Sequence, residues 1–290
     1  MRWLLLALLL AGCVQRPKPP APSPRYVVGA AYQAGGVWFY PQETFGYDAT
    51  GLAERLPDRK GLTADGEAFD PTAMAGAHPT LQLPAIARVT NIENGRQIVV
   101  RLNDRGPGKA GRILGLTRRA ADVLGLPANG AAPVRVQLES LPSQALRDGL
   151  HGGPAGITAA PRGAVTAESL APPPGTGRSA RGRVAGATPV AGGSAELQQE
   201  VPDRLPETVA QGAPQPGRLW IAAGQFGQAA YANQVKARLY GMPVQVERTP
   251  GARTPSFRVM AGPFSTVTAA DAALDRARAA GVTDAEIVVE

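Results

Sequence analysis

The stretch that decides the fold reads VRLNDRGP and runs from Val100 to Pro107. Its apolar first half is typical of a β-strand, and its Gly-Pro pair marks a turn. A strand that ends in such a turn carries the Asp104 carboxylate to the edge of a sheet, where side chains can meet a ligand. On this stretch alone, Asp104 could equally cap the turn or pair with Arg105.

Residues 50–140 around this stretch carry the signals of a compact β-rich domain with one helix. Asn94-Gly95 favours a hairpin turn between two strands. Thr117 is expected to cap a helix that runs to Leu124, and Gly125 should stop it. We predict strands at Ile86–Thr90, Gln97–Leu102 and Pro133–Leu138. Short strands with one helix and a closing strand favour a small closed barrel.

Residues 217–290 form a second domain, whose pattern predicts the order βαββαβ. The two halves mirror each other, and each has a strand, a Gly-x-Phe sequence and a helix, which supports a ferredoxin-like plan. The predicted strands are Leu219–Ala223, Pro243–Arg248, Ser256–Ala261 and Ala285–Val289, and the helices are Gln228–Tyr240 and Val267–Ala280.

Residues 1–13 read as a lipoprotein signal peptide. An apolar run from Trp3 to Ala11 is too short to cross a bilayer, and Gly12-Cys13 follows it. The sequence ending at Cys13 looks like a bacterial lipobox, which predicts cleavage before this residue and lipid on its sulfur. An ordinary secretory signal with an incidental cysteine is the alternative. In bacterial lipoproteins an aspartate directly after the lipobox cysteine favours retention in the inner membrane. Because Val14 stands at this position, we expect an outer-membrane anchor that faces the periplasm.

Two further segments connect these parts. Residues 14–49 are expected to be a proline-rich tether and an N-terminal arm, in which Trp38, Phe39 and Tyr40 could be sugar platforms or buried packing residues. Residues 141–216 are rich in Pro, Gly and Ala and poor in aromatics. They are therefore predicted to be a disordered linker.

The net charge of +7 and the pI near 10 limit the possible partners. An exported protein does not meet nucleic acid in the cytoplasm. The acidic partners that remain are peptidoglycan and lipid head groups. The single cysteine excludes a disulfide within the chain. His78 and His151 are the only histidines, and His151 lies in the predicted linker, so we expect no metal site and no cofactor.

Several short motifs in order resemble the rare lipoprotein A family of lytic transglycosylases. They are TADGE (63–67), AHPTL (77–81), VTN (89–91) and NDRGP (103–107). The resemblance implies a six-stranded double-psi β-barrel, with Asp104, Glu67 and His78 at the active-site positions. Arg105, next to the acid, is a candidate for substrate binding.

The chemistry of such an enzyme needs only one acid–base residue. The 6-hydroxyl of N-acetylmuramic acid attacks its own anomeric carbon, so Asp104 could first protonate the leaving oxygen and then act as a base. An acid that is protonated near neutral pH needs burial or a second carboxylate beside it, and Glu67 across the groove would serve. His78 would hydrogen-bond to substrate or to a carboxylate.

Alternatives stay open for these residues. Glu67 could be an exposed turn acid, and His78 a satisfied loop histidine. The family usually has an Ala-Ser-Trp-Tyr-Gly signature where this chain has AERL (53–56), and often Asp-Leu-Ser where it has GLT (115–117). A protein that binds glycan without cutting it, or an expansin-like wall-loosening protein, is therefore also possible.

The second domain resembles the sporulation-related repeat, or SPOR domain, in GQF (224–226), FRV (257–259) and GPF (262–264). The resemblance implies binding to glycan strands stripped of stem peptides at the division septum, where divisome proteins are possible partners. Ala222 stands where the family often has glutamine. Phe226 and Phe264 could instead pack in the core. The candidate glycan-binding residues are Trp220, Gln225, Phe226, Arg258 and Phe264.

Overall fold

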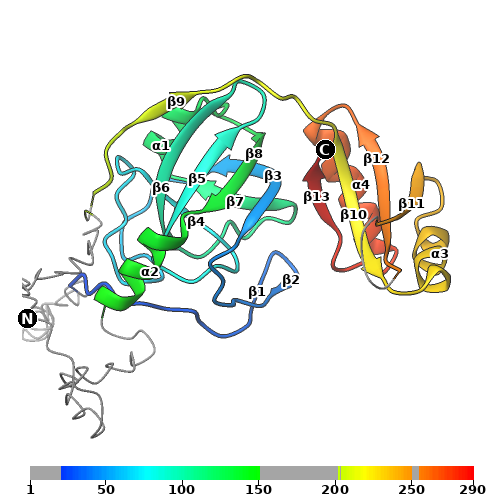
Figure 1. Ribbon diagram of the computed structural model, residues 1–290, viewed down its shortest axis with the longest axis horizontal. Helices are drawn as coiled ribbons and strands as arrows, with labels where there is room; N and C mark the ends of the chain where they lie inside the picture. The colour runs from blue at the N-terminus through cyan, green and yellow to red at the C-terminus, as the bar shows by residue number, and fades with distance from the viewer. Residues whose placement is uncertain (1–20, 151–201, 203, 250–254) are drawn as a thin grey trace, which may run out of the picture.

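The computed structural model describes residues 21–150, 202, 204–249 and 255–290 (Figure 1). The predicted signal peptide with Cys13, most of the predicted linker and His151 lie outside these ranges.

Six strands close into the predicted barrel. They are β3 (Asp48–Arg55), β4 (Ala75–Ala77), β5 (Ala85–Asn91), β6 (Arg96–Asp104), β7 (Arg112–Leu116) and β8 (Ala131–Leu138). Their order is β4-β7-β3-β8-β5-β6, and a parallel pairing of β4 with β6 completes the ring. Aliphatic side chains such as Leu83, Val100 and Leu114 fill the interior and are fully buried. The barrel therefore has a packed core, and its site must lie at a rim.

Helix α1 (Arg118–Leu124) begins and ends as the sequence predicts. The Thr117 side chain accepts a hydrogen bond from the Ala120 amide at 3.4 Å. Gly125 ends the helix in the left-handed conformation, with φ of 78°. Ala120, Ala121 and Leu124 face the barrel interior and are buried.

The N-terminal arm wraps the barrel. The Ser23 and Arg25 amides donate to the carbonyls of Gly66 and Asp65 at 2.9 and 2.8 Å. A Cβ at Gly66 would lie 2.3 Å from the Ser23 carbonyl oxygen, so only glycine permits this approach. Farther along, β1 (Tyr32–Ala34) and β2 (Val37–Phe39) form a two-stranded hairpin.

The structure differs from the expected linker at both of its ends. Helix α2 (Ser140–Gly149) packs on β5, where the Ser143 hydroxyl accepts from the Ile86 amide at 2.9 Å. Strand β9 (Val209–Gln211) pairs with the free edge of β6. Backbone pairing needs little side-chain hydrophobicity, so the polar composition of this segment gives no sign of it.

The C-terminal domain has the predicted βαββαβ order. Its elements are β10 (Leu219–Phe226), α3 (Ala229–Arg238), β11 (Val244–Arg248), β12 (Phe257–Phe264), α4 (Val267–Ala279) and β13 (Glu286–Val289). The strands form an antiparallel sheet in the order β11-β12-β10-β13. Both helices cover one face of the sheet (Figure 1), and the core lies between helices and sheet.

The two domains contact each other through β13 and α4. The Arg112 guanidinium binds both Asp271 carboxylate oxygens at 2.7 and 2.8 Å. The Thr50 hydroxyl donates to the Val289 carbonyl at 2.8 Å. Leu52 on the barrel is fully buried within the core cluster of the C-terminal domain. A disordered linker requires no contact between the domains, whereas the structure packs them together.

None of the helices described by the structure is long and apolar enough to cross a membrane.

Candidate active site and glycan-binding face

Asp104 stands at the last position of β6, and three donors hold its carboxylate. Oδ1 accepts from the amides of Ala64 and Arg105, both at 2.9 Å. Oδ2 pairs with the Arg59 guanidinium, which also lies 4.7 Å from the Phe69 ring centre. The Asp104 side chain is 15% exposed and that of Arg59 is 37% exposed. Oδ1 is thus fixed by backbone, whereas Oδ2 depends on a side chain that can move.

Glu67 has partners of its own. Oε1 accepts from the Arg101 Nε at 2.7 Å, and Oε2 accepts from the Asn103 side-chain amide at 2.7 Å. Arg101 and Asn103 alternate along β6, so both project to the same face of the strand. Among the described residues Glu67 makes no ion pair besides that with Arg101, whose side chain is only 6% exposed. The carboxylate is therefore fixed close to β6 by charge-assisted hydrogen bonds.

A cavity of about 300 Å³ opens beside Glu67. Glu67, Arg101 and Asn103 supply its polar side, and Phe69 and Met74 supply apolar surface. Arg204 and Leu205, from the segment that leads to β9, also line it. The cavity is large enough for about one sugar ring by the usual scale of ligand pockets. Asp104 is not among its lining residues.

The turn from Thr63 to Glu67 connects the two carboxylates. The Ala64 amide reaches Asp104, and the Asp65 amide donates to the Asn103 carbonyl at 3.2 Å. The two acids therefore lie on one short framework, although each bonds to a different cation. We had expected mutual proximity or burial to protonate Asp104, and the structure instead gives it Arg59 as its partner.

Asp65 is a further acid that our sequence analysis did not select. It is fully buried, and its Oδ1 accepts from the Thr63 hydroxyl at 2.6 Å and from the Glu67 amide at 3.1 Å. Its Oδ2 has no partner among the described residues. Burial, and next the charge of Glu67, raise the pKa of Asp65 to about 7.

His78 is buried beneath the rim and is 1% exposed. Its Nδ1 accepts from the amides of Thr80 and Leu81 at 3.2 and 3.1 Å, so the proton of the neutral ring is on Nε2. Burial, and then the charge of Arg105, lower the pKa of His78 to about 3. In this arrangement His78 is a neutral structural residue, and its amide also donates to the Asp104 carbonyl at 3.1 Å.

Arg105 points its guanidinium at backbone carbonyls. It donates to the carbonyls of Leu81 and Val28, and to that of His78 at 3.4 Å. Desolvation lowers the pKa of Arg105. The resemblance makes Arg105 a candidate for substrate binding, whereas in the structure its side chain bonds to backbone carbonyls and fastens the arm beside the candidate active site.

The predicted trio of Asp104, Glu67 and His78 is thus gathered at one rim of the barrel, but the cations that hold the two acids were missed. Arg101 gave a signal, since an arginine inside an apolar strand usually has a buried partner. Arg59 gave none, because its partner lies 45 residues away.

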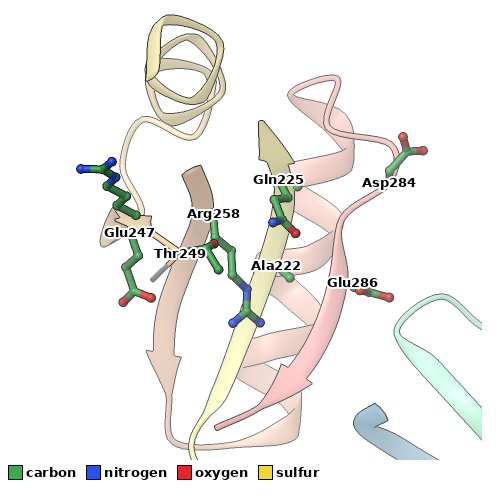
Figure 2. Close-up of a pocket in the computed structure, with 9 residues that line it drawn as sticks. Ala222, Gln225, Glu247, Thr249, Arg258, Asp284 and Glu286 are labelled. Atoms are coloured by element: carbon green, nitrogen blue, oxygen red, sulfur yellow. The ribbon is translucent and has the colours of Figure 1, made fainter. Parts of the chain in front are cut away.

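The open face of the C-terminal sheet carries a second cavity, of about 490 Å³. Gln225 and Arg258 are register partners on β10 and β12 and both line it (Figure 2). Figure 2 also shows Glu247 on one side of the cavity, with Asp284 and Glu286 on the other. Ala222 lines the floor, and its short side chain leaves room there.

The three aromatic candidates of this domain do not line the cavity. Phe226 and Phe264 are partly buried and pack against the domain core, which is the alternative that the sequence left open. Trp220 is half-buried on β10 and lies against Gly262, where a Cβ would come within 3.0 Å of its ring. Of the predicted glycan-binding residues, only Gln225 and Arg258 line the cavity.

Across the described ranges, no group of three or more His, Cys, Asp or Glu side chains could hold a metal ion.

Comparison with known proteins agrees with this division of the chain. A family model described as "Lytic transglycolase" matches residues 47–136, and the "SPOR domain" model matches residues 215–288. The first covers the barrel, and the second covers the C-terminal sheet and its helices.

Curated relatives carry the name endolytic peptidoglycan transglycosylase RlpA. One from Yersinia pestis is 38% identical over 44% of this chain and 43% of its own length. One from Escherichia coli K12 is 44% identical over 39% of this chain and 30% of its own length. The chain thus spans less than half the length of either relative.

A solved structure titled as the RlpA SPOR domain from Pseudomonas aeruginosa is 23% identical, with a TM-score of 0.23, over 24% of this chain and 96% of that one. The chain therefore combines a barrel that matches the lytic transglycolase model with a C-terminal domain that matches the SPOR model, and it is similar to several RlpA proteins.

Proposed function

We propose that this protein is a peptidoglycan lytic transglycosylase. It cleaves the bond between N-acetylmuramic acid and N-acetylglucosamine in denuded glycan and leaves a 1,6-anhydromuramyl end. The observation that carries the proposal is the fixed Asp104 carboxylate, which has Oδ1 on two backbone amides and Oδ2 on one displaceable arginine.

The geometry assigns different tasks to the two oxygens of Asp104. Oδ1 is held by the amides of Ala64 and Arg105 and sets the direction of the carboxyl group. Oδ2 becomes available when the partly exposed Arg59 moves away. We assign proton transfer to Oδ2, because a proton-transferring atom must come within hydrogen-bond reach of the substrate oxygen.

The reaction then needs no external nucleophile. After Arg59 has moved away and Asp104 Oδ2 has taken up a proton from solvent, Oδ2 gives that proton to the glycosidic oxygen as the bond to the anomeric carbon breaks, and the departing N-acetylglucosamine keeps it as its hydroxyl. The 6-hydroxyl of the same muramic residue bonds to the anomeric carbon and returns its proton to Asp104. The residue ends as it began, and water is not consumed.

Glu67 supports the positive charge that develops on the sugar ring. Its carboxylate is oriented by Arg101 and Asn103 and faces the 300 Å³ cavity. A preorganised charge of this kind stabilises a transition state without reorganisation. His78 keeps its place in the site as a positioning residue, because its amide and ring brace the loop that follows β4.

The SPOR domain is proposed to hold glycan at the cavity lined by Gln225 and Arg258 and so to bring the enzyme to denuded strands at the septum. Lipid on Cys13 would anchor the protein at the outer membrane, facing the periplasm, where divisome proteins are possible partners. Linking two binding modules raises the effective concentration of the enzyme at its substrate.

Mass spectrometry of products released from amidase-treated sacculi tests the proposal. The full chain should release anhydromuramyl ends, and Asp104→Asn should reduce the rate by about 100-fold or more. Asp122→Asn, at an acid on α1 that pairs with Arg55, is the matched control and should stay active. Sacculi that are bound but yield no anhydro product would support a non-catalytic binding protein instead.

A further inference from the structure

Two large aromatic side chains on the N-terminal arm are exposed next to the candidate active site. Trp38 is 57% exposed and Tyr40 is 68% exposed. Aromatic side chains of this size usually bury most of their surface, and exposing them costs free energy. Within the described residues neither ring stacks on another aromatic ring, and both keep more than half of their surface open to solvent.

The β1–β2 hairpin, which carries Trp38 and leads directly into Tyr40, is held by an aromatic stack. Tyr32 and Phe39 are register partners, and their rings stack with centroids 5.3 Å apart. Side chains alternate along a strand, so Trp38 points to the face opposite this stack, together with its register partner Gln33. Tyr40 follows two positions after Trp38 and is exposed as well. The stack fixes one face of the hairpin and leaves the other free.

The hairpin is attached to the two segments that hold the catalytic groups. The Tyr32 hydroxyl donates to the Pro79 carbonyl at 3.0 Å, one residue beyond His78. Arg105, which follows Asp104, donates to the Val28 carbonyl just before the hairpin. Gly35 in the hairpin turn lies against Gly108, and a Cβ there would be 2.2 Å from the Gly108 carbonyl oxygen.

The pKa of Tyr32 depends on its burial and on two charges of the candidate active site. Burial raises the pKa of Tyr32, the Arg105 charge lowers it, and the Asp104 charge raises it further. The contacts with Pro79, Arg105 and Gly108 therefore place the hairpin beside the two segments that carry His78 and Asp104.

We propose that Trp38, Tyr40 and Gln33 form a sugar subsite that holds one hexosamine ring of the glycan strand adjacent to the bond at Asp104. The inference rests on the proposed function and names a place where that substrate is held. A pyranose ring offers a face of C–H groups to an aromatic plane, and the Gln33 amide supplies both a donor and an acceptor for hydroxyl and acetamido groups. This ring of the glycan is thereby held in place before the bond at Asp104 is cut.

Quenching of Trp38 fluorescence tests this subsite directly. The full chain carries Trp3→Phe and Trp220→Phe so that Trp38 is the single tryptophan, and Asp104→Asn so that no glycan is consumed. Denuded glycan oligomers should cut iodide quenching of Trp38 at least twofold, and dextran oligomers of equal length should not. Unchanged quenching at a glycan concentration that saturates the chain would overturn the proposal.

Substitutions sharpen the test. Trp38→Ala should raise the KM of the active chain for soluble glycan about tenfold with little change in kcat, and Trp38→Tyr should restore most of the loss. Tyr240→Ala is the matched control, because Tyr240 is 97% exposed on the other domain. Equal effects of Trp38→Ala and Tyr240→Ala would also refute the subsite.

The fluorescence result is independent of turnover. Protection of Trp38 in a chain whose parent shows no anhydro product would refute the proposed reaction and retain the subsite. If the parent releases anhydro product but glycan does not protect Trp38 from quenching, the subsite is refuted and the proposed reaction is retained.

Discussion

The barrel rim and the open face of the SPOR sheet hold their charged side chains in different ways. At the barrel rim, Glu67 and Asp104 each accept hydrogen bonds on both carboxylate oxygens, from partners that include the buried Arg101. On the SPOR sheet, Arg258 bonds to Glu290 at the surface and Gln225 bonds to Ser256. The barrel site is preorganised, as the proposed chemistry on one bond requires, whereas the polar side chains of the sheet face are held by surface contacts alone.

The difference should be visible in stability when the arginine of each cavity is replaced by methionine. In Arg101→Met the Glu67 carboxylate loses a partner that is 6% exposed, and we expect a loss of about 3 kcal/mol in the free energy of unfolding. Arg258→Met breaks the ion pair of Arg258 with Glu290, whose side chains are 36% and 43% exposed. The loss in the free energy of unfolding should therefore be under about 1 kcal/mol. Urea unfolding measures both. Similar losses would remove the contrast between the cavities.

The contact between the domains comes next in expected size. Asp271→Ala leaves the buried Arg112 without its bidentate partner, so we expect a loss of about 2 kcal/mol and a separation of one calorimetric transition into two. Asp275→Ala, one turn later on α4 and exposed, is the control and should keep one transition. Two transitions in the unmodified chain would show that the domains do not melt as one unit.

The pH dependence of stability tests the buried acid of the barrel site. The folded state raises the pKa of Asp65 from 3.8 to about 7, so it binds a proton more tightly than the unfolded chain does. That contribution is complete below about pH 4 and is lost as the pH rises to about 7. Asp65→Asn keeps the shape without the titration, so its free energy of unfolding should rise relative to that of the parent as the pH goes from about 4 to about 7.

Melting temperatures across that pH range measure the effect. Asp284→Asn, at an exposed acid beside the SPOR cavity, should follow the parent at every pH. A constant difference between Asp65→Asn and the parent would mean that Asp65 is ionised throughout.

The smallest effect is expected on the SPOR face. Gln225→Ala removes one neutral hydrogen-bonding group from the cavity, and should weaken binding to denuded glycan by about fivefold. Gln245→Ala, at an exposed glutamine on β11 outside the cavity lining, is the control. Co-sedimentation with amidase-treated sacculi measures the binding of both variants. Equal binding by the two would show that Gln225 is not part of the glycan site.

Much of the fold could be predicted because its signals are local. Thr117 and Gly125 set the ends of α1, and alternation set β5, β6 and β8 to within a few residues. Helix α2 and strand β9 could not be predicted, because α2 has no side-chain cap and β9 is held by backbone pairing to β6. These elements exist through tertiary contacts, and the composition of 141–216 does not reveal such contacts.

The candidate site divides in the same way. Asp104, Glu67 and His78 are predicted as site residues from motifs, and the structure places them at one rim, where their roles stay a prediction. Their electrostatic environment could not be found, since Arg59 and Arg101 reach their acids over 45 and 34 residues. His78 in particular changes from a possible substrate ligand to a buried neutral residue, because two backbone amides occupy its Nδ1.

The central claim is that the barrel cleaves glycan and that the SPOR domain binds denuded glycan and so brings the barrel to it. One assay tests it most directly, in which mass spectrometry counts anhydromuramyl ends released from denuded sacculi and from short soluble glycan. Asp104→Asn should lose at least about 100-fold on both substrates, whereas Arg258→Ala should lose activity on sacculi only. An Asp104→Asn protein that stays active, or an Arg258→Ala protein equally impaired on soluble glycan, would contradict the account.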